Sequence, residues 1–179
     1  MMPGTCPVSS PSMAIFPIRT YPDPVLRMAA RSVDAVDGEV RRLIEDMIET
    51  MYAAPGVGLA APQIGVSLRV VVFDVGDGPH ALVNPVLEEA TGSWVYEEGC
   101  LSVPDRYWPI KRPAYARATG LDERGRPIMC EGDELMGRVL QHEIDHLEGT
   151  LLLSRLARRV KKDALRQLRE AFLETPEPR

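Results

Sequence analysis

Residues 141–146, Gln-His-Glu-Ile-Asp-His, carry the side chains of this chain that are best suited to chemistry. On a helix, His142 and His146 would lie four positions apart and project from the same face. Two imidazoles so placed can bind one divalent metal ion, and the carboxylate of Glu143 beside the first of them can act as a base toward water. Two of only three histidines in the chain stand at this spacing, which favours a metal site over a chance match.

A catalytic metal site usually takes three protein ligands, so a third ligand is expected elsewhere in the chain. Cys100 is the leading candidate, because it follows Gly99 in a polar stretch where the backbone can approach closely. A buried, inert thiol is the alternative for this residue. The other candidates are weaker: His80 lies in a turn-like stretch, Cys6 in a Pro/Ser-rich segment, and Cys130 at the end of an expected strand, where a free cysteine is most often a core residue.

The residues around the two histidines predict a buried helix. Asp133 is a suitable N-cap and Gly149 is a suitable stop signal. Between them an apolar stripe recurs with helical period, formed by Leu135, Met136, Val139, Leu140, Ile144 and Leu147. Buried histidines beside carboxylates need partners, and a metal ion would supply one.

Periodicity elsewhere predicts an α+β domain. We expect an irregular or short helical entry at 25–30, an amphipathic helix with a core-facing methionine stripe at 40–51, and a final helix at 155–173. Strands joined by short turns are expected at 68–74, 81–86, 93–97, 114–121 and 127–131. Short connections between the strands favour antiparallel sheets.

Three segments in register resemble a known family. Residues 56–63 read Gly-Val-Gly-Leu-Ala-Ala-Pro-Gln, residues 98–102 read Glu-Gly-Cys-Leu-Ser, and residues 141–149 contain the histidine motif. In this order they closely resemble the signature motifs of the bacterial type of peptide deformylase, over about residues 14 to 160. The resemblance implies antiparallel β-sheets around a central helix that bears the His-Glu-x-x-His motif, with an N-terminal and a C-terminal helix.

The resemblance also implies a set of site residues. One divalent metal ion would be held by Cys100, His142 and His146. That ion would be Fe²⁺ in the cell, with Zn²⁺, Ni²⁺ or Co²⁺ possible in purified protein. Glu143 would be the general base and then the general acid, and the Gln63 side chain and the Leu101 backbone N–H would form an oxyanion hole.

The implied reaction is removal of the formyl group from the N-formyl-methionine of newly made polypeptides, with release of formate. Gly58 and Arg106 are expected to contact the substrate. An apolar pocket for methionine is expected from Leu101, Ile44 and Val139. Asp145 is expected to support the site by pairing with an arginine such as Arg112, and Glu98 is expected to play a supporting part.

Two other classes of function stay open from the sequence. A His-Glu-x-x-His metallopeptidase shares the two histidines and the glutamate, but it usually takes its third ligand downstream. A non-enzymatic module that binds a metal or the ribosome is the other. The upstream cysteine and the Gln63 segment favour the deformylase, and the presence of every acid, base and ligand argues against an inactive protein.

Composition and charge limit the domain organisation, the compartment and the kinds of partner that the chain can have. We expect residues 1–12, rich in Pro and Ser, to be a disordered extension and residues 13–179 to form a single catalytic domain. Three cysteines without framework spacing indicate a reducing cytoplasm, and no apolar run is long enough to span a membrane.

A net charge of −5 argues against general nucleic-acid binding. Residues 151–179, however, hold eight Lys or Arg against four Asp or Glu, which suggests either a solvated amphipathic helix or a surface that docks on the ribosome.

Overall fold

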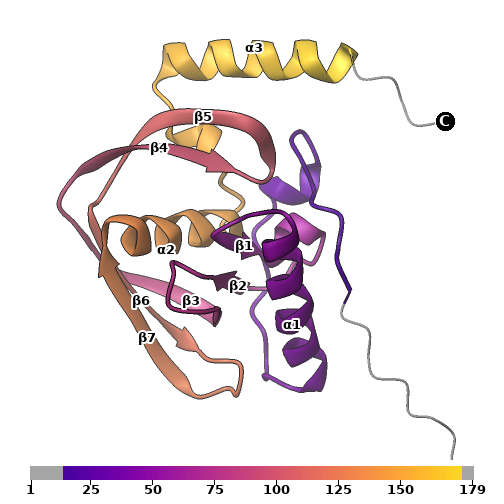
Figure 1. The fold of residues 1–179 in the computed structure, drawn as a ribbon, viewed down its shortest axis with the longest axis vertical. Helices are drawn as coiled ribbons and strands as arrows, with labels where there is room; N and C mark the ends of the chain where they lie inside the picture. The colour runs from indigo at the N-terminus through magenta and orange to yellow at the C-terminus, as the bar shows by residue number, and fades with distance from the viewer. Residues whose placement is uncertain (1–13, 175–179) are drawn as a thin grey trace, which may run out of the picture.

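Helix α2 (Glu134–Leu147), which carries both histidines, lies at the centre of the fold (Figure 1). The structure is a computed structural model and describes residues 14–174. Three short 3₁₀ helices are η1 (Pro24–Arg27), η2 (Ala61–Ile64) and η3 (Leu152–Arg155). The other elements are α1 (Gly38–Ala53), β1 (Gly58–Ala60), β2 (Val70–Phe73), β3 (His80–Thr91), β4 (Trp94–Cys100), β5 (Val103–Arg112), β6 (Tyr115–Leu121), β7 (Pro127–Asp133) and α3 (Arg158–Glu174).

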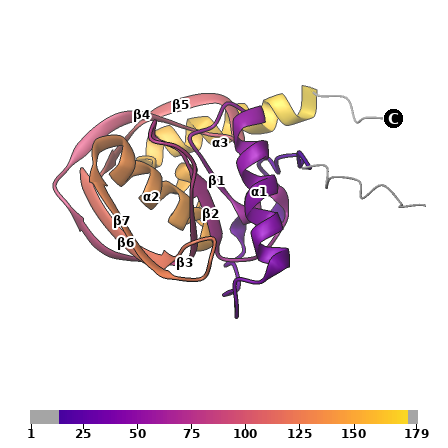
Figure 2. The same ribbon diagram turned by 60° about the horizontal axis from the view of Figure 1, so that its bottom comes forward.

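A five-stranded antiparallel sheet separates α1 from α2 (Figure 2). Its strands run in the order β1-β2-β3-β6-β7. All four residues of β2 are buried. Since successive side chains of a strand point to opposite faces, both faces of β2 are covered. Val70 and Val72 pack in one cluster with Met47 of α1, whereas Val71 and Phe73 pack in another with residues of α2. The sheet therefore has a helix on each face, and both helices are held by apolar burial.

Helix α2 ends where the sequence predicts. Gly149 has φ of +68° and its N–H donates to the His146 carbonyl at 3.2 Å, so the left-handed conformation closes the last turn. Asp133 takes the N-cap position, but its side chain makes no capping hydrogen bond. Ten residues of the helix are buried, which confirms the prediction of a buried helix.

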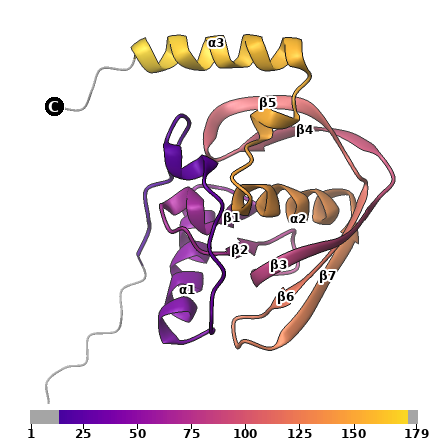
Figure 3. The same ribbon diagram turned by 180° about the vertical axis from the view of Figure 1, so that it is seen from behind.

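Strands β4 and β5 form a separate two-stranded hairpin on the other side of α2. Helix α3 crosses the outside of this hairpin, and its C-terminal end extends away from the rest of the molecule (Figures 1 and 3). A third apolar cluster fills the space beneath its first turns, formed by Val103, Ile110, Leu152, Leu153, Leu156 and Ala164. The hairpin is thus packed between α2 and α3.

The α+β class and the order of the expected elements are confirmed, with three differences in detail. Strands β1 and β5 were not expected, and β3 continues to Thr91 rather than ending near residue 86. Arg155 lies in η3, so the final helix begins at Arg158. The expected disordered extension at 1–12 lies outside the described residues. Within residues 14–174, none of the helices is long and apolar enough to cross a bilayer.

Candidate metal centre and active-site cavity

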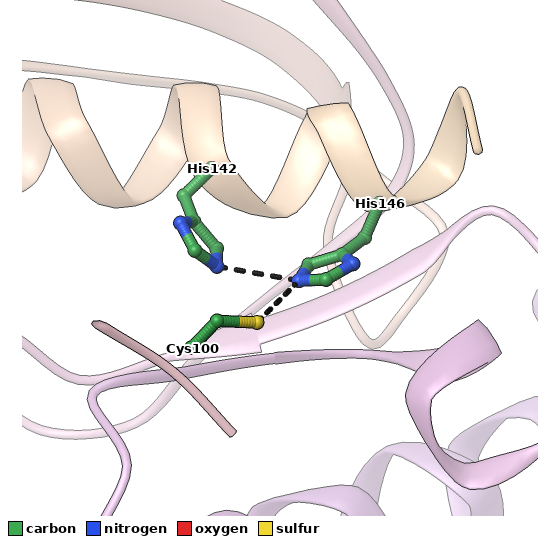
Figure 4. A group of neighbouring side chains, drawn as sticks. All are labelled: Cys100, His142 and His146. Atoms are coloured by element: carbon green, nitrogen blue, oxygen red, sulfur yellow. Dashed lines mark hydrogen bonds between the residues drawn. The ribbon is translucent and has the colours of Figure 1, made fainter. Parts of the chain in front are cut away.

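Three expected ligands meet between α2 and the end of β4 (Figure 4). The Nε2 atom of His146 lies 3.2 Å from the Cys100 Sγ and 3.2 Å from the Nε2 of His142. All three ligand atoms lie within 4.8 Å of one another. Spacing on α2 brings the imidazoles together, and the turn after Gly99 brings the thiol to them.

This donor set fits a divalent metal ion. One ring nitrogen carries at most one proton, so the His146 Nε2 cannot serve both of its neighbours through a single N–H. A tetrahedral ion with ordinary Zn–N and Zn–S bond lengths would hold such ligand atoms roughly 3.3–3.6 Å apart, close to the distances observed. Burial opposes ionisation of the Cys100 thiol, but the two adjacent imidazoles outweigh it and hold the pKa of Cys100 well below its usual range. The thiolate so favoured is the form that binds metals.

Glu98 sets the orientation of His142. Its Oε1 lies 2.7 Å from the His142 Nδ1, so that nitrogen donates its proton and leaves the Nε2 lone pair free for a metal. Burial would raise the pKa of Glu98, but hydrogen bonds from His142 and Arg112 hold it well below its usual range. Arg112 binds both Glu98 oxygens and also donates to Asp145 at 2.8 Å. The expected pairing of Asp145 with Arg112 is therefore observed.

Glu143 is buried beside the ligands. It is 4% exposed, and its Oε2 has no hydrogen-bond partner among the described residues. Burial raises the pKa of Glu143 above its ordinary value. A Cβ atom on Gly58 would lie 2.3 Å from the Glu143 Oε1. Gly58, expected to contact the substrate, therefore also makes room for this carboxylate.

The amide of Gln63 is held in one orientation. Its Oε1 accepts the Ala60 backbone N–H at 2.8 Å, which leaves Nε2 as the group that faces the ligands. That nitrogen donates to the Ser102 hydroxyl at 3.1 Å and lies 3.8 Å from the Cys100 Sγ. The side chain is 1% exposed, so a donor stands fixed at the wall of the site.

A cavity of about 670 Å³ opens over these residues. The expected site residues Gly58, Gln63, Cys100, Leu101, His142 and Glu143 line it, whereas the expected ligand His146 does not. Arg106 also lines it and donates to the side chain of Gln167 in α3 at 2.9 Å. Val139 lines the cavity as expected, but Ile44 does not, because α1 directs it into the core on the far side of the sheet. Leu135 and Tyr96 stand among the apolar wall residues instead.

Sequence reasoning missed two residues of this site. Ser102 holds the Gln63 amide, and Arg138 binds Glu98 from the helix turn before His142. The helical spacing of Arg138 and His142 could have placed both on one face. No local signal could have paired Arg138 with a carboxylate forty residues earlier in the chain.

Comparisons with known proteins agree with this geometry. The family model described as polypeptide deformylase matches residues 15–162. A peptide deformylase of Acidothermus cellulolyticus is 52% identical over 159 residues, which cover 89% of this chain and 88% of the relative.

Solved structures agree as well. The peptide deformylase of Thermus thermophilus has a TM-score of 0.82 at 44% identity, covering 87% of this chain and 94% of that one. A class I type b peptide deformylase of Acinetobacter baumannii with Met-Ala-Ser bound has a TM-score of 0.77 at 28% identity, covering 81% of this chain and 100% of that one. These matches favour the deformylase over the two other classes of function, a His-Glu-x-x-His metallopeptidase and a non-enzymatic binding module. The chain belongs to the polypeptide deformylase family.

Proposed function

We propose that this protein is a metal-dependent hydrolase that removes the formyl group from the N-formyl-methionine of newly made polypeptides and releases formate. One observation carries the proposal beyond family membership. A fixed amide donor, a buried carboxylate, the Cys100 thiol and the His142 imidazole converge on the wall of a single cavity, with the His146 Nε2 3.2 Å from both of these ligand atoms. A metal-assisted amide hydrolysis uses these groups together: a proton acceptor, a donor for the developing oxyanion and a Lewis acid.

In this proposal Cys100, His142 and His146 hold the ion. When bound there, a divalent ion would polarise the formyl carbonyl and ease the ionisation of water at neutral pH. Glu143 takes a proton from the attacking water as the new C–O bond forms, and gives it to the departing amine as the C–N bond breaks. The products are formate and a free methionyl N-terminus. The raised pKa of Glu143 suits both halves of this transfer.

Charge that grows on the formyl oxygen needs donors that are in place beforehand. We assign these to the Gln63 Nε2 and the Leu101 backbone N–H. Gln63 is suited to this part because its other amide atom is already fixed by Ala60. A pre-oriented donor costs no rearrangement when the transition state forms.

The cavity suits a methionyl peptide. Leu101, Val139 and Leu135 supply an apolar wall, and Arg106 stands where it could bind the peptide backbone. Met-Ala-Ser in the Acinetobacter baumannii structure has the form of a deformylated product, which supports a substrate of the type formyl-Met-Xaa-Xaa. We propose Gly58 as a further substrate contact, since it lines the same cavity.

The ion in the cell is proposed to be Fe²⁺, as the family implies, with Zn²⁺, Ni²⁺ or Co²⁺ as substitutes in purified protein. A donor set of one thiolate and two imidazoles would accept any of these ions.

We further propose that residues 13–179 act as one catalytic unit in the cytoplasm, on chains that emerge from the ribosome. Helix α3 would dock there through Arg158, Arg159, Lys161 and Lys162. Arg158 and Arg159 are exposed, as docking through them would require. The alternative is an ordinary solvated helix.

The test is an anaerobic assay of Fe²⁺-loaded protein with formyl-Met-Ala-Ser. Formate release without cleavage of internal peptide bonds is expected. Internal cleavage of an unformylated peptide, with no formate from the formylated one, would overturn the proposal. A Cys100→Ala sample prepared in parallel controls for a contaminating deformylase, because it should neither retain the ion nor release formate.

A further inference from the structure

We propose that Arg138 is a positioning residue that fastens α2 to β4 and so fixes the two elements that supply the metal ligands. The inference rests on the proposed use of Cys100, His142 and His146 as ligands. It concerns how their separation is maintained, which neither the helix nor the hairpin determines alone.

The ligands come from two units that share no β-ladder. His142 and His146 lie on α2, whereas Cys100 ends β4. Among the described strands, β4 pairs only with β5, and the five-stranded sheet forms a separate ladder. Short linkers at residues 92–93 and 113–114 tie the base of the hairpin to that sheet, and Cys100 lies at the opposite end of β4. A backbone bond from Tyr21 to the Ser102 carbonyl holds this end to the N-terminal segment, and side-chain contacts with α2 hold it to the helix.

Arg138 makes contacts of this kind along β4. Its guanidinium donates to the Glu98 Oε2 and, at 3.1 Å, to the Trp94 carbonyl oxygen. The same group lies 4.8 Å from the centre of the Trp94 ring and 5.6 Å from that of Tyr96. Arg138 is 3% exposed, so these contacts are made away from water. A planar guanidinium can donate in two directions and still stack on a ring, and an ammonium group cannot.

The consequence for the metal site passes through Glu98. Arg138 occupies the Oε2 of that carboxylate, while the Oε1 accepts from the His142 Nδ1. Arg112 of β5 also binds Glu98 and donates to Asp145 of α2, so it forms a second link between the hairpin and the helix, one that starts from β5 rather than from β4. Without Arg138, the carboxylate would keep its charge partner and lose its arginine anchor on α2. The Glu98–His142 bond and the Arg112–Asp145 bond would remain, and they would hold the His142 ring and the end of β4 together less tightly than the parent network does.

The experiment compares Arg138→Met and Arg138→Lys with two matched substitutions. Arg117→Met removes an arginine from a half-buried pair with Glu89, and Arg155→Met removes one from the same charged network, where its partner is Asp145 on α2. Each protein is loaded with Co²⁺. The rate of Co²⁺ release to a chelator, the thiolate-to-cobalt absorption band, the melting temperature, and kcat and KM for formyl-Met-Ala-Ser are then measured.

Release from Arg138→Met should be faster by roughly 10- to 100-fold, the usual effect of losing a group that orients a ligand. Arg138→Lys, which keeps the charge and so should fold, should lie between Arg138→Met and the parent. Both should show a shifted cobalt band and a lower kcat with KM little changed, and Arg117→Met should match the parent. Folded Arg138 variants with the parental release rate and spectrum would overturn the proposal, and so would equal loosening by Arg155→Met. The cobalt measurements need no substrate, so they stand apart from any failure of the deformylase assignment.

Discussion

At the scale of single residues, the proposed chemistry depends on three groups whose surroundings the fold determines. Glu143 has an oxygen with no described partner, both amide atoms of Gln63 are hydrogen-bonded, and Gly58 leaves the space that the carboxylate fills. Each of these features can be tested by a substitution whose expected effect on metal content, kinetics or stability differs from those of the other two.

Glu143→Gln should keep the metal and lose the reaction. The substitution removes a proton acceptor but no ligand, so turnover should fall by at least ~100-fold while metal content stays near that of the parent. Metal analysis and formate release on the same sample check this. His142→Ala, in contrast, should lose the ion, and near-normal turnover by a metal-loaded Glu143→Gln sample would remove Glu143 from its assigned role.

Gln63→Ala should lower kcat and kcat/KM together by roughly 100-fold, or ~3 kcal/mol, with little change in KM, because in the proposed role its amide would act only as charge builds on the formyl oxygen. Gln63→Glu should be at least as damaging, since it places a negative charge at that point. Steady-state kinetics, metal content and melting temperature are to be measured together. A folded, metal-loaded Gln63→Ala protein with unchanged kcat would contradict the assignment.

Gly58→Ala should reduce turnover by displacing the Glu143 carboxylate, which a Cβ would approach to 2.3 Å. We expect a loss of roughly 10-fold or more, comparable with partial loss of a general base. Gly38→Ala is the matched control, because nothing lies within 4 Å of a Cβ there, and it should leave kinetics unchanged. Parental kinetics in Gly58→Ala would show that the carboxylate can move without cost.

The site residues differ in how far sequence could reach them. His142 and His146 are predictable because their relation is local, a matter of helical spacing. The network around Glu98 joins residues from β4, β5 and α2, and only the folded chain brings Arg112 and Arg138 to one carboxylate. Gly58 was interpreted through the substrate alone, since its contact with Glu143 spans 85 positions of sequence.

At the scale of elements, periodicity succeeded where one face or both faces of an element meet the core. The apolar stripe of α1 predicted a helix and the run of valines in β2 predicted a strand, because burial in the core requires apolar residues at those positions. Strand β1 was missed because three residues carry no period, and β5 was missed because charged, aromatic and proline residues alternate irregularly along a mostly exposed hairpin strand.

The turn between β6 and β7 offers a prediction at this scale. Asp122 accepts from the backbone N–H groups of Arg126 and Arg124 and from the Arg126 side chain. These bonds hold the pKa of Asp122 below its ordinary value of 3.8. Its stabilising effect is therefore complete above the ordinary pKa and is lost as pH falls through the lower, folded-state value. Asp122→Asn should lower the melting temperature at pH 7, and the difference from the parent should shrink in strong acid. A difference independent of pH would contradict this.

At the scale of the whole molecule, one ion would join the central helix to the hairpin. An ion that binds only the folded chain stabilises it by about 2.7 kcal/mol when its free concentration is 100 times Kd. For a chain of this size, that corresponds to a rise in melting temperature of roughly 5–10 °C. Chelation should therefore lower the melting temperature by a similar amount, as scanning calorimetry can measure. Cys100→Ala should melt at the same temperature with and without chelator, and an equal response from that variant would mean that the ion acts elsewhere.

The order of the site residues along the chain bears on how the protein becomes active during its own synthesis. Gln63 and Cys100 are made early, but the two imidazoles belong to α2, which follows all seven strands. Translation proceeds from the N-terminus at roughly 5–20 residues per second, so a growing chain passes through a period in which most of its sheet residues exist and no metal site can. Any product that terminates before His146 lacks a ligand. On the proposed ligand assignment such a product could not form the three-ligand site, so only copies that include the whole of α2 could become active.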